Sequence, residues 1–224
     1  MPYILNIHTA TETAIVNLCS GKDVIDSSVN SDAKQHSSFL HTAISSMLKK
    51  QNINAKQLNA IGVSCGPGSY TGIRVGLAAA KGLCYALNIP LVTYNSLELI
   101  ALSTLLLVKD ATSLYCPMID ARRMEVYTAM YDGDRKEIAA PEAMILDENS
   151  FSDILLSNVI IFSGSGSNKF REVSKNANAK FIEAEISTEA IAKISWQKFE
   201  NNEFENVSGV KPVYIKDFHT LARK

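Results

Sequence analysis

Short apolar runs separated by brief polar turns make up the start of the chain. Residues 3–7, 14–19 and 24–29 form such runs, and turns this short predict an antiparallel meander of three strands. From residue 33 to residue 51 the apolar positions recur in helical pairs, which predicts a helix. The further elements expected before residue 109 are a strand at 60–63, a helix at 71–87, a strand at 91–94 and a helix at 96–108. This order predicts a mixed sheet of about five strands covered by helices.

The same order of elements begins again after residue 109. The expected elements are strands at 114–119 and 125–131, a polar insertion at 132–141, a strand ending at 144–146, a helix at 151–156, a strand at 159–162, a helix at 168–176, a strand at 180–182 and a helix at 188–200. Sequence self-similarity between the halves does not show, but the repeated order predicts two related lobes, 1–108 and 109–224. We therefore expect an α/β protein with two ribonuclease-H-like lobes, each a mixed sheet flanked by helices.

The helix expected at 71–87 has almost no polar face. After Ile73 its only charged residues are Arg74 and Lys81, which lie seven residues apart on one narrow stripe. A helix that is apolar nearly all round must be covered on both sides. One cover is the sheet that contains residues 60–63, and the other is either a partner subunit, which we favour, or the chain itself. The small residues of the helix, at spacings that let a second helix approach closely, are Gly72, Gly76, Ala79 and Ala86.

Composition and charge exclude several classes of function. With 22 basic and 23 acidic residues the net charge is −1, so the chain lacks the basic excess of proteins that hold nucleic acid unaided. Its four cysteines are far apart, form no CxxC pair and are expected to be buried thiols in a reducing compartment. No signal peptide is apparent, and the longest apolar segment, 97–108, is too short to span a bilayer. These features predict a cytoplasmic protein with no membrane association.

Two glycine-rich stretches are candidates for chemistry. Residues 62–66 read Gly-Val-Ser-Cys-Gly and match the G-x-S-x-G elbow of serine hydrolases, so a hydrolase using Ser64, with Asp120 and His219 as partners, is an alternative. The elbow requires a helix directly after the serine, whereas Gly66-Pro67-Gly68 intervenes here. The glycines match neither a dinucleotide fold nor a P-loop. A backbone nest at 69–72 or the turn at 164–167 could still receive a phosphate group.

Four motifs together resemble one family. Residues 4–12 (ILNIHTATE), 66–76 (GPGSYTGIRVG), 120–127 (DARRMEVY) and 212–215 (PVYI) are similar, in this order, to the signatures of the TsaB family, also called YeaZ. The resemblance implies an ASKHA (actin-like) fold of two ribonuclease-H-like lobes. It also implies a dimerisation subunit of the bacterial complex that installs threonylcarbamoyl on N6 of the adenosine next to the tRNA anticodon.

The resemblance further implies a subunit without its own catalytic site. The two metal-binding histidines of the catalytic paralogue, TsaD, align with Ser96 and Ile100, and His8 replaces an acidic residue common in the family. We therefore expect no intrinsic metal or cofactor, with ATP or ADP at most at the partner interface. A glycoprotease-type peptidase using Ser64 and a small ASKHA-type kinase that binds ATP tightly are further alternatives. The expected partners are TsaD, the ATPase TsaE, a second copy when the chain is alone, and tRNA only through the complex.

The resemblance also implies which residues form the partner interface and which contact a nucleotide. Helices 33–51 and 71–87 would form a helical bundle with those of the partner, and Arg74 at the edge of that bundle would pair with a partner carboxylate or a nucleotide phosphate. The partner-facing residues are expected to be Phe39, Ala43, Met47, Gly72, Arg74, Val75, Gly76, Ala79 and Leu83. The expected nucleotide contacts are Ser69, Arg74, Gly164, Gly166 and Asn168.

Overall fold

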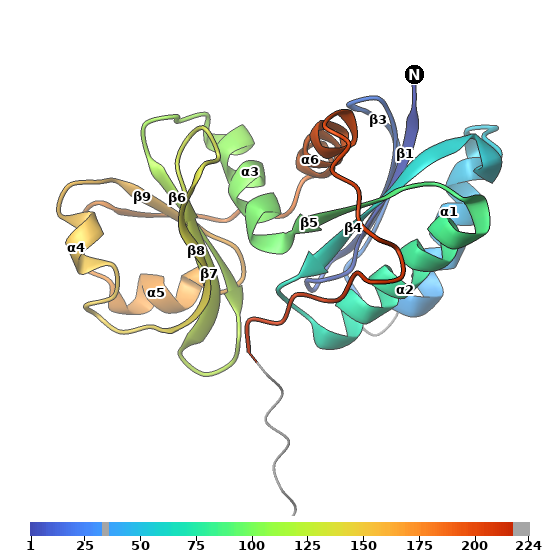
Figure 1. Ribbon diagram of the computed structural model, residues 1–224. Helices are drawn as coiled ribbons and strands as arrows, with labels where there is room; N and C mark the ends of the chain where they lie inside the picture. The colour runs from blue at the N-terminus through green and yellow to red at the C-terminus, as the bar shows by residue number, and fades with distance from the viewer. Residues whose placement is uncertain (33–35, 217–224) are drawn as a thin grey trace, which may run out of the picture.

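The structure, a computed structural model, describes residues 1–32 and 36–216. In these ranges the chain forms two lobes, each built on a five-stranded mixed sheet (Figure 1). The helix expected at 33–51 is described as α1 (His36–Lys50). Its first expected residues, 33–35, and the chain end from residue 217, which includes His219, lie outside the described residues.

The first sheet carries the N-terminal strands. It contains β1 (Tyr3–His8), β2 (Ala14–Ser20), β3 (Asp23–Asn30), β4 (Leu58–Gly66) and β5 (Leu91–Asn95), in the order β3-β2-β1-β4-β5. The first three strands pair antiparallel, as the short turns between them require, whereas β4 is parallel to β1 and β5 to β4. Nearly every residue of β1 and β2 is buried, so their continuous apolar runs reflect a central position covered on both faces.

The second sheet repeats this plan. It contains β6 (Leu114–Asp120), β7 (Glu125–Tyr131), β8 (Glu137–Ile145), β9 (Ile160–Ser163) and β10 (Ala179–Ile182). From one edge its order is β8-β7-β6-β9-β10, with β6, β7 and β8 antiparallel and β9 and β10 parallel to β6. Strand for strand, order and direction match the first sheet. The prediction of two related ribonuclease-H-like lobes is therefore confirmed.

One expected element differs from the structure. Residues 132–141 were predicted as a polar insertion, yet β8 begins at Glu137 and includes the second half of that segment. The prediction was wrong there because β8 is an edge strand whose exposed positions accept charged residues such as Glu137 and Glu142.

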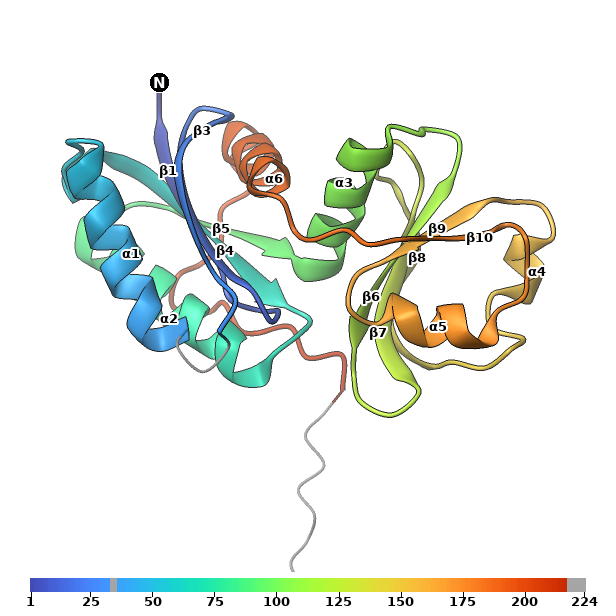
Figure 2. The same ribbon diagram turned by 180° about the vertical axis from the view of Figure 1, so that it is seen from behind.

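Helices cover the outer faces of both sheets. α1 and α2 (Tyr70–Leu87) pack on one face of the first sheet, and α5 (Ser167–Val173) packs on the second, near the short α4 (Ser152–Leu155), as Figures 1 and 2 show. A short 3-10 helix, η2 (Ala55–Gln57), precedes β4. The core inside each lobe lies between its sheet and these helices.

The last helix of each lobe packs on the sheet of the other lobe. α3 (Ser96–Val108) follows β5 but packs mainly on β6, and α6 (Thr188–Glu200) follows β10 but packs on β1, β2, β3 and β5. The two helices also contact each other at the junction (Figure 2). Residue 108, the expected boundary, lies between the strands of the first sheet and those of the second along the chain. In space, however, the last helix of each lobe packs on the sheet of the other lobe.

Two further apolar clusters lie at the junction of the lobes. The first, which we call the α3 cluster, consists of Leu97, Ile100, Ala101, Tyr115, Ile119, Ala129, Tyr131 and Ile161. The second joins β2 and β5 to α3 and α6 through residues such as Ile15, Leu99 and Ile191. After α6 the chain runs back along β5 and α2 (Figure 1), and we call residues 205–216 the C-terminal strap. The lobes are thus joined by exchanged helices and by the returning chain.

Candidate functional site: an interlobe cleft and the outer face of α2

A cleft of about 870 Å³ lies between the two lobes. The first lobe contributes the β1–β2 turn and the start of α2, and the second contributes the end of β6, the turn at Gly164 and the segment before α6. Hydroxyl groups and a few charges dominate its polar lining: Thr11, Glu12, Thr13, Ser69, Tyr70, Thr71, Asp120, Arg122, Tyr127, Ser165, Glu185 and Thr188. A concave site with polar groups from both lobes is suited to a small polar ligand.

Close backbone packing builds the wall of the cleft in the first lobe. The Thr9 hydroxyl donates to the Gly72 carbonyl oxygen at 2.7 Å, and the Ser69 N–H donates to the Ala10 carbonyl oxygen at 2.7 Å. A Cβ at Gly68 or at Gly72 would lie 1.9 Å from the carbonyl oxygen of Ala10 or Thr9 respectively. These glycines are required because the β1–β2 turn sits directly against the start of α2.

The predicted phosphate nest at 69–72 is partly filled by the chain itself. Ser69 is the N-cap of α2, and its hydroxyl oxygen accepts the Gly72 N–H at 3.2 Å. His8 is fully buried, and its Nε2 lies 2.9 Å from the Thr11 hydroxyl. The imidazole therefore braces the β1–β2 turn from within.

The wall in the second lobe carries an ion pair. Asp120 at the end of β6 lies 2.9 Å from Lys169 Nζ, and its carboxylate also accepts the Arg122 N–H at 2.6 Å. Partial burial acts to raise the pKa of Asp120, but these two donors outweigh it and hold the pKa below its usual value. Asp120 is therefore an ionised carboxylate that orders the β6–β7 turn, where Arg122 and Arg123 both adopt positive φ.

The structure brings together some of the expected nucleotide contacts. Ser69 and Gly164 line the cleft from opposite lobes, while Arg74, Gly166 and Asn168 are not among its lining residues. A Cβ at Gly166 would lie 2.7 Å from Val126 Cγ1, so this glycine is needed for packing. Nucleotide contact at Ser69 and Gly164 stays a prediction. Sequence reasoning missed Thr13 and Glu185, because only the fold brings these single polar residues to the cleft.

The outer face of α2, defined here by Thr71, Ala78, Gly82 and Tyr85, is open to solvent. Tyr85 is 86% exposed, and no atom lies within 4 Å of a Cβ placed on Gly82. Toward α1 this face continues into the partly buried Val75, Ala79 and Leu83, while Phe39 on α1 is also partly buried. Small residues around a large exposed aromatic ring make a surface that a second helix can approach closely.

Four of the expected partner-facing residues point into the chain instead. Gly72 and Gly76 are buried, and a Cβ on Gly76 would lie 2.3 Å from Thr9 Oγ1. Ala43 and Met47 are buried in the core of the first lobe. The prediction was wrong for these residues because the small residues of α2 fall on two sides of the helix, and the glycines at 72 and 76 admit the chain's own β1.

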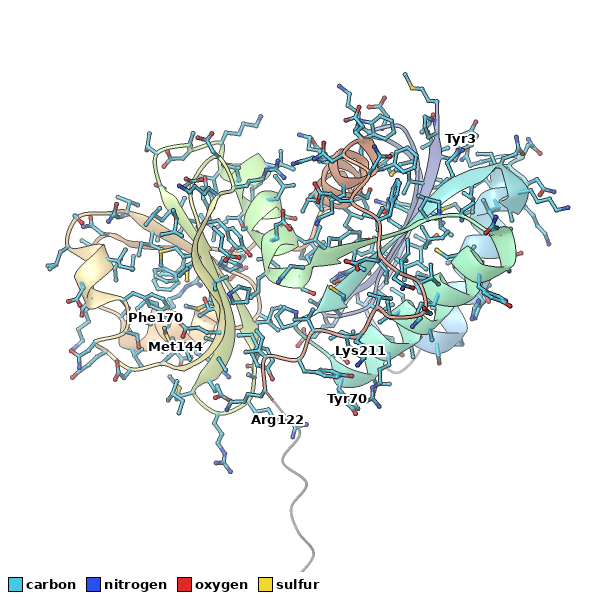
Figure 3. The ribbon with its side chains drawn as sticks, in the orientation of Figure 1. Tyr3, Tyr70, Arg122, Met144, Phe170 and Lys211 are labelled. Atoms are coloured by element: carbon cyan, nitrogen blue, oxygen red, sulfur yellow. The ribbon has the colours of Figure 1, made fainter. Side chains whose placement is uncertain are left out.

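Arg74 is exposed but is held by the C-terminal strap. Its guanidinium carbon lies 3.8 Å from the centre of the Tyr70 ring, and its Nε donates to the Tyr214 hydroxyl at 2.8 Å. Tyr70 and Tyr214 also stack, with ring centres 5.2 Å apart (Figure 3 labels Tyr70). Pairing of Arg74 with a partner carboxylate or a phosphate stays a prediction, and such a group would have to compete with Tyr214.

Ser64 does not have the geometry of a nucleophile. It is fully buried inside β4, which continues to Gly66, and its hydroxyl lies 2.8 Å from the equally buried Ser96 hydroxyl. A strand interior does not present the serine at the sharp turn that the elbow requires. The G-x-S-x-G match therefore reflects a buried strand with a serine pair that joins β4 to the start of α3.

Replacing Ser64 by alanine should lower the free energy of unfolding by about 1–2 kcal/mol, because the Ser96 hydroxyl would lose a buried partner. The double variant Ser64→Ala/Ser96→Ala removes both hydroxyls and should cost less than the sum of the single variants. Urea unfolding of the four proteins measures this coupling. Strictly additive costs would contradict a paired role for the two serines.

The four cysteines of the chain are also unsuited to nucleophilic chemistry, because all of them are buried. Burial raises the pKa of Cys19 and of Cys116 to about 12 and that of Cys84 to about 11, and it also raises the pKa of Cys65. Among residues 1–32 and 36–216, no group of three or more His, Cys, Asp or Glu side chains is placed to hold a metal ion. No helix in the same part of the chain is both long and apolar enough to cross a membrane.

Comparison with known sequences assigns a family to this architecture. A family model described as TsaD, tRNA N6-adenosine threonylcarbamoyltransferase, matches residues 23–210. The "tRNA threonylcarbamoyladenosine biosynthesis protein TsaB" of Bacillus subtilis (strain 168) is 36% identical over 128 residues, which are 57% of this chain and 54% of that protein. The protein of the same name from Escherichia coli (strain K12) is 26% identical over 225 residues, 96% of this chain and 94% of that protein.

Comparison with solved structures agrees on the fold. YeaZ from Pseudomonas aeruginosa superposes with a TM-score of 0.80 and 20% identity, covering 96% of this chain and 100% of that one. A second Pseudomonas aeruginosa structure, of an uncharacterised protein with similarity to the peptidase YEAZ, gives a TM-score of 0.84 at 20% identity, with the same coverage. The two-lobed arrangement is therefore common to these chains over nearly their full length.

Proposed function

Because this chain belongs to the TsaD family of tRNA N6-adenosine threonylcarbamoyltransferases, among its TsaB (YeaZ) members, we propose that it is the dimerisation subunit of a complex with a catalytic TsaD paralogue. It has no catalytic site of its own and supports the paralogue in threonylcarbamoylation of N6 of the adenosine next to the tRNA anticodon. The observation that carries the proposal is the outer face of α2, where small residues surround the exposed Tyr85.

The interior of the chain supports a role without chemistry. Ser96 and Ile100, at the positions aligned with the metal-binding histidines of the paralogue, are both buried. Ser96 bonds to Ser64, and Ile100 is part of the α3 cluster. A hydroxyl already paired inside the core and an alkyl side chain cannot replace two imidazole ligands.

The surface charge supports an indirect contact with tRNA. The net charge of −1 gives no excess of basic groups for the phosphate backbone, so tRNA is held by the assembled complex. The same α2 face pairs two copies of this chain when the paralogue is absent. ATP or ADP at the shared interface, contact with the ATPase TsaE and residence in the cytoplasm are further parts of this proposal.

Gly82→Leu tests the docking surface. A leucine side chain on the open side of α2 keeps the helix, because leucine has a higher helix propensity than glycine, but it holds a partner helix away. We expect co-purification with the TsaD paralogue to weaken about tenfold or more, which corresponds to roughly 1.4 kcal/mol or more of binding free energy. Affinity capture from cells that express both chains measures the effect.

The matched control is Gly82→Ala, which adds only one methyl group at the same position. It should retain the complex, and both variants should show the far-ultraviolet circular dichroism of the parent chain. Full complex formation by Gly82→Leu would contradict docking through this face. Loss of the complex in the alanine variant with an intact fold would show that the surface tolerates no added atom, which still supports docking there.

A further inference from the structure

The C-terminal strap first attaches to the edge of the first sheet. The Glu205 N–H donates to the Leu91 carbonyl oxygen at 2.8 Å and forms an isolated antiparallel bridge with β5, and the Thr93 hydroxyl donates to the Glu205 carboxylate at 2.8 Å. Lys81 on α2 then donates to the carbonyl oxygens of Ser208 and Val210, both at 3.2 Å. The strap therefore follows the polar side of α2, beside the outer face.

The second half of the strap is held at the end of β4 and at the start of α2. The Val213 N–H donates to the Cys65 carbonyl oxygen at 2.8 Å, and a Cβ on Gly66 would lie 2.7 Å from the Val213 carbonyl oxygen. Tyr214 follows, stacked on Tyr70 and bonded through its hydroxyl to Arg74. Tyr214 is 41% exposed, so these two contacts are made at the surface.

The next two residues reach the other lobe. Ile215 packs against the α3 cluster, and Lys216 forms an ion pair with Glu125 at the start of β7. The Glu125 carbonyl oxygen also accepts Lys169 Nζ at 3.0 Å, and Lys169 is the partner of Asp120 on the cleft wall. Three consecutive residues, 214–216, thus hold both lobes at once.

This attachment borders the cleft. Tyr70 lines the cleft and stacks on Tyr214, and Ile100 and Ile119 line the cleft and belong to the cluster on which Ile215 packs. In Figures 1 and 3 the strap passes below the junction near the labelled Tyr70 and Arg122, while α6 lies at the opposite side. Opening at the strap would therefore turn the lobes about the α3–α6 contact.

We propose that the C-terminal strap is a latch that fixes the angle between the two lobes and so sets the width of the interlobe cleft, with Tyr214 as the part that releases. Tyr214 is held by its ring stack on Tyr70, by the hydrogen bond from Arg74 and by a cation–π contact in which the Arg74 guanidinium carbon lies 5.9 Å from the centre of the Tyr214 ring. These contacts of an exposed side chain are weak enough to exchange with solvent or with a competing anionic group. This inference does not depend on the proposed function.

Tyr214→Ala tests the latch by the distance between the lobes. Spin labels are attached at Ser46→Cys on α1 and Glu172→Cys on α5, two exposed positions on opposite lobes, and pulsed electron paramagnetic resonance is recorded after dilution with unlabelled protein. The native cysteines are buried and do not compete for label. We expect Tyr214→Ala to shift the distance distribution to longer values and to broaden it.

Three further variants locate the effect. Lys216→Ala removes the ion pair to Glu125 and so weakens the attachment of the strap to the second lobe, which should shift the distribution in the same direction. Tyr214→Phe, which keeps the ring but not the hydroxyl, should give a smaller shift than Tyr214→Ala. Lys211→Ala changes an exposed side chain of the same strap and should leave the distribution unchanged (Figure 3). An unchanged distribution in both Tyr214→Ala and Lys216→Ala would overturn the latch, as would an equal shift in Lys211→Ala.

Discussion

Gly72→Ala should lower the free energy of unfolding by about 2 kcal/mol or more, whereas Gly82→Ala should raise it by up to about 1 kcal/mol. Both glycines lie within α2, so the intrinsic gain in helix propensity is similar. They differ in what the new methyl group meets. At Gly72 it would lie 1.9 Å from the Thr9 carbonyl oxygen, which belongs to the backbone and cannot rotate away, and at Gly82 it would meet open space.

Urea unfolding followed by circular dichroism measures this pair of substitutions. The hydrogen bond from the Thr9 hydroxyl to the Gly72 carbonyl oxygen should be lost with the same change, since the β1–β2 turn must move away from α2. If Gly72→Ala were as stable as the parent chain, the close contact between the β1–β2 turn and the start of α2 would be wrong.

Phe162→Ala should lower the free energy of unfolding by about 3–5 kcal/mol, the usual cost of removing a buried phenyl ring. Phe162 is fully buried in the second lobe and contacts three other rings: Phe151, Phe170 and Phe181. Phe204→Ala is the matched control, because Phe204 is 40% exposed and has only Phe199 as an aromatic neighbour among the described residues. Its removal should cost much less.

The fluorescence of the single tryptophan shows whether the loss of stability in the second lobe also destabilises the first lobe. Trp196 lies on α6, which belongs to the second half of the chain but packs on the first sheet. Because the lobes exchange α3 and α6, we expect Phe162→Ala to lower the unfolding midpoint by the same amount whether it is followed by Trp196 fluorescence or by circular dichroism. A tryptophan signal that keeps its parental midpoint would mean that the lobes unfold independently.

Local sequence signals predicted most of the architecture. The helices expected at 96–108 and 188–200 coincide with α3 and α6, whose starts are marked by the capping residues Asn95 and Ser187. The repeated order of strands and helices led to two related lobes, which the duplicated strand order confirms. Elements with strong periodicity or clear turns are determined locally, so the sequence alone is sufficient for them.

Contacts between distant residues could not be predicted in this way. Gly72 and Gly76 look identical in sequence to the small residues of a helix interface, and only the position of Thr9 shows that they face the chain itself. The exchange of α3 and α6 and the path of the strap depend on how two sheets meet, which leaves no local pattern. Arg74 stood out in the sequence as one of only two charged residues on its helix, but its hydrogen-bond partner Tyr214 is 140 residues away.

The central claim is that this chain acts by docking through the outer face of α2 and not by chemistry of its own. The most direct test is the amount of threonylcarbamoyladenosine formed in tRNA by the purified TsaD paralogue, with the other components of its pathway supplied, when the added subunit is the parent chain, Gly82→Ala or Gly82→Leu. The account predicts parental product formation with Gly82→Ala and a strong loss with Gly82→Leu that a large excess of the variant restores, because mass action drives a weakened interface back together. Equal product formation with Gly82→Leu and the parent chain at limiting concentration would contradict it.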